Sequence, residues 1–251
     1  MIVFRDVHKR FGDREILRGV NLEIPAHETT AIFGVSGGGK STIIKHIVGL
    51  LQPTSGDIFV DGIKVNGADE KTLLQIRKKV GFLFQNGALF DSMNIEDNVA
   101  FPIREHQKDL GRKEVEKLVD EKLSMVGLKP AVVKTLFPEE LSGGMRKRVG
   151  LARTLALEPS IILYDEPTSG LDPVTSDLIT QMIRTLQHDL NVTSVLISHD
   201  VSETFKAGDK FAMLFDGKII AFGDEDAFRH SSNPVVQQFI NSSSKGPIQF
   251  D

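Results

Sequence analysis

A glycine-rich segment directly after a short apolar stretch dictates much of the local structure of this chain. Ala31–Phe33 is typical of a buried strand. The residues that follow it are Gly34, Val35, Ser36, Gly37, Gly38, Gly39, Lys40, Ser41 and Thr42. In the pattern G-x-x-x-x-G-K-[ST], glycines let consecutive backbone N–H groups curl around a phosphate, and the next helix adds the positive end of its dipole. Lys40 would reach the β- and γ-phosphates of a nucleotide, and the hydroxyl of Ser41 would ligate Mg²⁺. The segment therefore predicts a nucleotide site.

A second acidic element is needed to support the metal and to activate water. The apolar stretch Ile161–Tyr164 ends in the two carboxylates Asp165 and Glu166. Asp165 suits the support of Mg²⁺, whereas Glu166, one residue on and pointing differently, can polarise the attacking water. The pair predicts a hydrolytic nucleotide site, with Asp165 and Ser41 on the metal side.

A second loop suited to anions precedes a basic helix expected over Arg146–Leu157. Ser142 is a good N-cap, and Gly143 and Gly144 leave the backbone N–H groups at the helix start accessible. One chain rarely needs two cradles for one γ-phosphate. Two chains arranged head-to-tail would, each offering this loop to the nucleotide of the other.

Taken together, these elements resemble those of ABC-transporter ATPases. Leu141–Met145 (LSGGM) is similar to the signature loop of that family, and Gln85 matches the glutamine that links Mg²⁺ to the transmembrane partner. Ser169–Asp172 matches the D-loop of the family, and His199 matches its switch histidine, which holds the γ-phosphate. Phe11 lies where the family stacks an aromatic ring on adenine. The resemblance covers residues 1 to about 223 and implies ATP and Mg²⁺ as ligands.

Two positions depart from the family pattern. Met145 stands where the signature loop usually has glutamine, which removes a polar side chain but leaves the serine and both glycines. Phe11 stands in place of tyrosine, which keeps the face of the ring and loses the hydroxyl. We expect activity to survive both changes.

The resemblance implies an α/β fold: a P-loop NTPase core with an antiparallel β-subdomain and an inserted helical subdomain. Residues 1–85 would form the β-subdomain and the phosphate-loop part of the core. Residues 86–156 would form the helical subdomain with the signature loop, and residues 157–223 the rest of the core. Residues 224–251 would form a C-terminal helix and tail, with the Ser/Gly/Pro-rich stretch Asn241–Asp251 a loose end.

Local patterns predict several of the elements. Strands are expected over Met1–Val7, Ile16–Ile24, Thr193–Ile197, Lys210–Phe215 and Lys218–Phe222, and helices over Ser41–Leu51, Lys71–Lys79 and Arg112–Val126. Asp61-Gly62 and Asp216-Gly217 suit type I′ hairpin turns.

Composition excludes several other classes of protein. The chain has 30 Lys+Arg, 34 Asp+Glu and no Cys, so it carries no electrostatic footprint for nucleic acid and can form neither disulfides nor a cysteine zinc site. No apolar run approaches the ~20 residues of a membrane span. Function at a membrane would therefore require a transmembrane partner.

A closer resemblance is to the ATPases associated with Mla/Mce systems, and it runs through Phe84–Phe90, Asn94–Ala100, Pro102–His106 and Asn233–Phe239. It implies a subunit at the cytoplasmic face of a bacterial inner membrane that energises phospholipid movement. Its partners would be a second copy of the chain, a permease that docks after Gln85, an MCE-domain lipid-binding protein and a small accessory subunit. An importer of a small polar solute, such as an amino acid, remains the alternative. The apolar residues Phe228–Ile240 would pack on their own domain or on another subunit.

Overall fold

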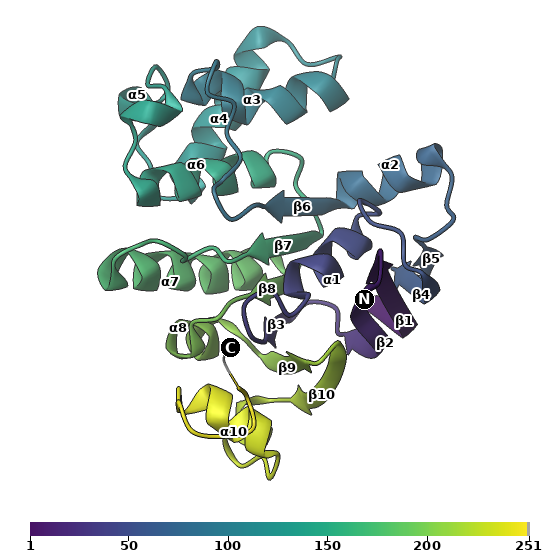
Figure 1. Ribbon diagram of the computed structural model, residues 1–251. Helices are drawn as coiled ribbons and strands as arrows, with labels where there is room; N and C mark the ends of the chain where they lie inside the picture. Colours follow the sequence, from purple (N-terminus) through teal and green to yellow (C-terminus); the bar gives the residue numbers. More distant parts are fainter. Residues whose placement is uncertain (250–251) are drawn as a thin grey trace.

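The strand that precedes the glycine-rich segment lies inside a six-stranded sheet. The computed structural model describes residues 1–249. The strands of this sheet are β3 (Thr29–Phe33), β6 (Val80–Leu83), β7 (Ile161–Asp165), β8 (Thr193–Ile197), β9 (Lys210–Phe215) and β10 (Lys218–Gly223). Their order is β10-β9-β3-β8-β7-β6, with β10 antiparallel to β9 and the other pairings parallel. With the helices around it, this sheet confirms the predicted α/β P-loop fold (Figure 1).

A separate antiparallel sheet comes from the first part of the chain. Its strands are β1 (Ile2–Phe11), β2 (Arg14–Ile24), β4 (Ser55–Val60) and β5 (Ile63–Lys64), in the order β2-β1-β4-β5. Asp61 and Gly62, between β4 and β5, have φ values of 48° and 78°, and Asp216 and Gly217, between β9 and β10, have 46° and 73°. Positive φ at both central residues is the signature of a type I′ turn, so both hairpin predictions are confirmed.

Most helices start where a short polar side chain caps them. The helices are α1 (Lys40–Ile47), α2 (Glu70–Lys79), α3 (Ile95–His106), α4 (Arg112–Met125), α5 (Pro130–Val133), α6 (Gly143–Leu155), α7 (Pro173–Leu190), α8 (Val201–Ala207), α9 (Glu225–Arg229) and α10 (Pro234–Ile240). Ser142, Asp172 and Asp200 each accept a hydrogen bond from a backbone N–H of the following turn. Within residues 1–249, none of these helices is both long and apolar enough to cross a membrane.

Two predicted helices differ from the observed ones by more than one residue at an end, and two by a single residue. The helix expected over Ser41–Leu51 ends at Ile47, because Gly49 has a φ of 65° and closes the helix in the left-handed region. The basic helix expected over Arg146–Leu157 begins three residues earlier, at Gly143, where Ser142 caps it, so both signature glycines lie in its first turn.

The side chains of the six-stranded sheet divide into two cores. Ile32, Leu163 and Val195 point to one face and pack with α1 and the antiparallel sheet. Phe33 and Tyr164 point to the opposite face and pack with α7 and the helices α3, α4 and α6. This division follows from the alternation of side chains along a strand. The subdomain bounds at residues 85, 156 and 223 stay a prediction.

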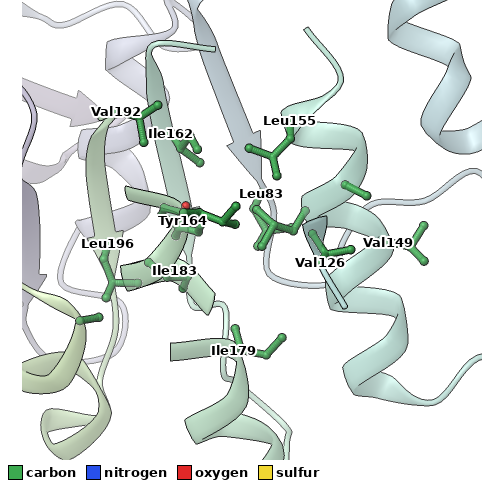
Figure 2. Close-up of a cluster of buried hydrophobic side chains, with 14 of the residues drawn as sticks. Leu83, Val126, Val149, Leu155, Ile162, Tyr164, Ile179, Ile183, Val192 and Leu196 are labelled. Atoms are coloured by element: carbon green, nitrogen blue, oxygen red, sulfur yellow. The ribbon is translucent and has the colours of Figure 1, made fainter. Parts of the chain in front are cut away.

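Tyr164, the residue before Asp165, lies at the centre of the second core. It is fully buried, and Figure 2 shows it between Leu83 of β6, Ile183 of α7 and the neighbouring side chain Ile162. A rigidly packed ring at this point fixes the end of β7, so the two carboxylates that follow start from a well-defined position.

The predicted loose tail is anchored at Ile248, whereas residues 241–247 before it are exposed and form no helix or strand. Ile248 is 6% exposed, its N–H donates to Oε1 of Gln238 at 2.6 Å, and its C=O accepts from Nε2 of Gln238 at 3.1 Å. Phe228 and Val236 are buried in the chain's own core, and the ring of Phe239 lies 5.7 Å from that of Phe33. The apolar residues of this segment therefore pack on their own domain. Residues 250–251 of the predicted tail lie outside the described residues.

Candidate functional site

The glycine-rich loop connects the end of β3 to the start of α1. Gly39, the residue before the helix, has a φ of 101°, and a Cβ there would lie 2.8 Å from Cγ2 of Ile16. Both the backbone conformation and the close neighbour require glycine at this position. The loop can therefore curl toward β2 and direct its N–H groups into the space above the helix.

Lys40 is buried beneath this loop. Its Nζ donates to the carbonyl oxygens of Gly34 at 2.7 Å and Val35 at 3.1 Å, and it lies 4.0 Å from Oε1 of Glu166. Burial lowers the pKa of Lys40, and the nearby carboxylates of Glu166 and Asp165 oppose that shift. The hydrogen-bond partners of the ammonium are thus neutral carbonyl oxygens, which an anion can replace.

The residues predicted to hold Mg²⁺ on the protein side lie next to each other. The hydroxyl of Ser41 donates to Oδ1 of Asp165 at 3.0 Å, and Asp165 is 8% exposed. A hydroxyl and a carboxylate supply the oxygen ligands that Mg²⁺ prefers. Burial raises the pKa of Asp165 and the charge of Glu166 adds to that shift, whereas the hydrogen bond from Ser41 and the nearby lysines oppose it. This donor set fits a hard divalent cation.

The raised pKa of Asp165 implies that the stability of the folded chain depends on pH. Because the folded state disfavours the charged carboxyl, metal-free protein loses stability as the pH rises from the ordinary pKa of aspartate through the raised value. Asp165→Asn keeps the acceptor for Ser41 without the charge. We expect its Tm in EDTA at neutral pH to exceed that of the wild type by roughly 2 °C. Thermal scans at pH 3 should show no difference, and a lower Tm for the variant at pH 7 would contradict the prediction.

Glu166 and His199 meet at the ends of two neighbouring strands. Glu166 follows β7 with a φ of 50°, and its backbone N–H donates to the C=O of Ile197 in β8 at 3.0 Å. Oε2 of Glu166 is hydrogen-bonded to Nδ1 of His199. A non-glycine residue in the left-handed region is uncommon and often marks a functional site. Here it turns the carboxylate toward the lysine and the histidine.

These side chains surround one cavity of about 580 Å³. The cavity is lined by Phe11, Arg14, Ile16, Ser36, Gly37, Gly39, Lys40, Ser41, Thr42, Gln85, Glu166, Ser169 and His199. Phe11 is 47% exposed and the ammonium of Lys9 lies 4.8 Å from its ring centre, so part of the ring remains accessible to a flat group. Val35 and Gly38 line an adjacent depression instead. Most of the predicted loop, Gln85, Glu166, His199 and Phe11 are thus brought together, whereas Gly34 and Asp165 do not line this cavity.

Arg14 and Ile16 are cavity residues that the sequence motifs did not reveal. Arg14 pairs with Phe11 across the β1–β2 ladder, so the two side chains lie at the same end of the cavity. The two-residue turn Gly12-Asp13 between them was the signal that could have found this pairing. Nε2 of Gln85 donates to the hydroxyl of Ser169 at 3.3 Å, which joins two further motifs at the cavity wall.

Ser142, Gly143 and Gly144 do not line this cavity. They form the start of α6, where the hydroxyl of Ser142 accepts from the N–H of Met145 at 3.3 Å. Met145 is partly buried against the second core, which contains Tyr164, so the residue that departs from the family pattern has a packing role here. The phosphate loop and the signature loop of one chain therefore do not form one site.

Comparison with known proteins gives concordant results at the levels of sequence family and fold. Residues 17–169 match the ABC transporter family. A solved dimeric ATP-binding cassette, bound to ADP and phosphate in a post-hydrolysis state, superposes with a TM-score of 0.82 at 34% identity, over 89% of this chain and 98% of that one.

Two kinds of named relatives match nearly the whole chain. "Probable ribonucleotide transport ATP-binding protein mkl" of Mycobacterium leprae is 44% identical over 247 residues, which are 98% of this chain and 70% of that protein. This chain spans 66% of the protein of the same name from Mycobacterium tuberculosis. "Intermembrane phospholipid transport system ATP-binding protein MlaF" of Escherichia coli K12 is 41% identical over 250 residues, 100% of this chain and 92% of that protein.

Proposed function

Because this chain belongs to the ABC transporter family, we propose that it is the ATP-hydrolysing subunit of a transporter that moves phospholipid between the inner and outer membranes of a bacterium. The likeness to MlaF over 100% of this chain and 92% of that protein supports this function more than any other observation. The chain would sit at the cytoplasmic face of the inner membrane, attached to a permease. An MCE-domain lipid-binding protein and a small accessory subunit would complete the complex.

Each ATP would be held between two copies of the chain. One copy contributes the cavity with Phe11, Lys40 and Glu166, and the other contributes the start of α6 with its signature loop. The separation of these two regions within one chain supports a head-to-tail dimer. Such a dimer has a two-fold axis, so its interface is isologous: each copy offers the same two regions to the other, and the assembly closes at two copies.

The residues of the cavity are suited to phosphoryl transfer to water. Glu166 takes a proton from the water whose oxygen attacks the γ-phosphorus, and the bond between that phosphorus and the β–γ bridging oxygen breaks to give ADP and phosphate. Lys40 stabilises the charge that develops on the phosphate oxygens, and His199 holds the γ-phosphate. Ser41, Gln85 and Asp165 would hold Mg²⁺, and the ion would neutralise negative charge on the phosphates.

The names of the relatives state different cargo, ribonucleotide for mkl and phospholipid for MlaF. Isolation of the native complex distinguishes a lipid cargo from a soluble one. The tagged chain is purified in a gentle detergent from its own membranes, and the accompanying chains and lipids are identified by mass spectrometry. A permease, an MCE-domain protein and bound phospholipid are the expected result. A permease with a solute-binding protein and no lipid would overturn the lipid function and leave the ATPase intact.

A separate groove supports a permease as partner. It has a volume of about 370 Å³ and lies between the end of α2, the strand β6, the helix α3 and the last turn of α6. Phe84, Phe90 and Phe101 line it and are 36–40% exposed, and the guanidinium of Arg153 lies 5.4 Å from the ring centre of Phe90. Exposed aromatic rings beside arginine are typical of protein–protein hot spots. We propose that a cytoplasmic helix of the permease docks here.

Phe90→Ala is expected to weaken binding to permease-containing membranes by about tenfold, because it removes an aromatic anchor from the groove. Phe222→Ala is the matched control, since Phe222 is 44% exposed on the edge strand β10 and lies outside the groove. Co-sedimentation with such membranes measures binding, and the ATPase rate of the isolated chain should stay unchanged for both variants. Equal binding of both variants would remove the groove from the interface.

A further inference from the structure

One face of α6 holds the segment that follows β6. A Cβ on Gly150 would lie 3.0 Å from Cα of Gly87, so the helix and the segment are in direct backbone contact. Nη2 of Arg153 donates to the carbonyl oxygens of Gly87 at 3.0 Å and Ala88 at 2.8 Å. These contacts tie α6 and the segment around Gln85 into one unit.

Lys147 extends this unit to the backbone of Glu166, the proposed general base. The residue is 6% exposed, and its Nζ donates to the backbone C=O of Gln85 and, at 3.2 Å, to the backbone C=O of Glu166. Gln85 follows β6, Glu166 follows β7, and Lys147 comes from a helix between them in sequence. A single ammonium therefore bridges two motifs of the ATP cavity without lining the cavity itself.

The burial of this cation shows that it has specific partners. Desolvation lowers the pKa of Lys147, and the charges of Glu166 and Asp165 act in the opposite direction. Buried lysines are rare unless they are paired or hydrogen-bonded. Here the carbonyls and the two nearby carboxylates supply that compensation.

The position of Lys147 in α6 links it to the second ATP site. Ser142 caps this helix, and Lys147 lies five residues further on, about 7.5 Å along the axis at 1.5 Å per residue. In the proposed dimer, the start of α6 faces the ATP of the partner copy, whereas Lys147 holds the backbone of Glu166 in its own copy. An ATP bound to the partner copy that displaces α6 would therefore also displace the backbone of Glu166 in this copy.

We propose that Lys147 is a positioning residue that couples the two ATP sites, by tying the helix of the signature loop to the backbone of Gln85 and Glu166. This inference rests on the proposed ATP-sandwich dimer. It adds a contact through α6 within each copy, and it requires that loss of the ammonium changes turnover and cooperativity more than ATP binding.

The test compares Lys147→Met and Lys147→Gln with Lys122→Met. Lys122 is a matched control: it is a buried lysine of α4, 3% exposed, paired with Glu121 at 2.9 Å and Glu158 at 3.0 Å outside the ATP cavity. For each variant, kcat and the Hill coefficient for ATP are measured, together with the dissociation constant of a fluorescent ATP analogue and the Tm.

We expect Lys147→Met to lower kcat by about 10- to 100-fold and to bring the Hill coefficient close to one, because Glu166 loses its backbone support. The dissociation constant of the analogue should change less than about threefold. Lys122→Met should lower the Tm by a similar amount and leave kcat and the Hill coefficient unchanged. Lys147→Gln, which can still donate to one of the two carbonyls, should retain an intermediate kcat.

Two outcomes would overturn the inference. One is that Lys147→Met matches Lys122→Met in kcat and Hill coefficient. The other is that kcat falls only in proportion to weaker ATP binding. If Lys147→Met does not fold, Lys147→Gln decides by the same criteria. A wild-type chain without ATPase activity would instead contradict the proposed function.

Discussion

Replacement of Glu166 by glutamine is expected to lower kcat by about 10²–10⁴-fold while ATP still binds. Glutamine has nearly the same shape but cannot take the proton of the attacking water. Oε1 of Glu166 lies 4.0 Å from Nζ of Lys40 and Oε2 is hydrogen-bonded to His199, so the carboxylate is directed into the cavity. ATP that binds without being cleaved should hold the two copies together. Gel filtration with ATP should therefore show a stable dimer.

Glu203→Gln provides the control for this experiment. The side chain of Glu203 is 14% exposed, close to the 17% of Glu166, and pairs with Lys206 at 2.7 Å outside the ATP cavity. We expect this variant to hydrolyse ATP at the wild-type rate. Hydrolysis by Glu166→Gln within a few-fold of wild type would remove Glu166 from the role of general base.

Lys40→Ala is expected to weaken ATP binding by about tenfold and to lower kcat by about 10²–10³-fold. The residue is 5% exposed, and its ammonium donates to the carbonyl oxygens of Gly34 and Val35. Those neutral partners can be exchanged for phosphate oxygens when ATP binds. Removal of the charge affects both the bound state and the charge that develops during phosphoryl transfer, so both constants should change.

Isothermal titration of ATP and steady-state ATPase assays measure the two effects separately. Lys122→Ala removes a lysine of comparable burial, 3% exposed, from outside the cavity and should change neither constant. Wild-type kcat in Lys40→Ala would mean that this lysine does not contact the transferred phosphate.

The parts of the site that were predictable from the sequence are those built from contiguous motifs. The glycine-rich loop, Asp165 and Glu166 each follow a buried strand, and their spacing alone indicates their chemistry. Because parallel strands place their carboxyl ends at the same edge of the sheet, β3, β7 and β8 bring these motifs together. The α/β fold and both type I′ turns were predictable for similar local reasons.

The features that escaped prediction depend on contacts between distant segments. Nothing near Lys147 in the sequence indicates that its ammonium reaches Gln85 and Glu166. The Ser/Gly/Pro-rich composition of the last residues suggested a loose tail, yet Gln238 binds both backbone groups of Ile248. Composition reports the conformational freedom of a segment, whereas a single buried amide can hold it in place.

In the proposed dimer, each ATP site is shared between two copies of the chain. Since the chain has no cysteine, a single engineered thiol can be attached to each side of the proposed site. Ser36→Cys places one in the phosphate loop and Ser142→Cys places one in the signature loop. Both serines are exposed, and cysteine is close to serine in size. Each chain then carries one thiol, so a link between the two can form only between copies.

The decisive measurement is cross-linking by a short bismaleimide in an equal mixture of these two variants, each also carrying Glu166→Gln. A covalent dimer that forms with ATP in the mixture, and neither without ATP nor with either variant alone, is the predicted result. If both variants bind ATP and the mixture stays monomeric on a denaturing gel, the phosphate loop and the signature loop do not meet across two copies, and the shared-site account is wrong.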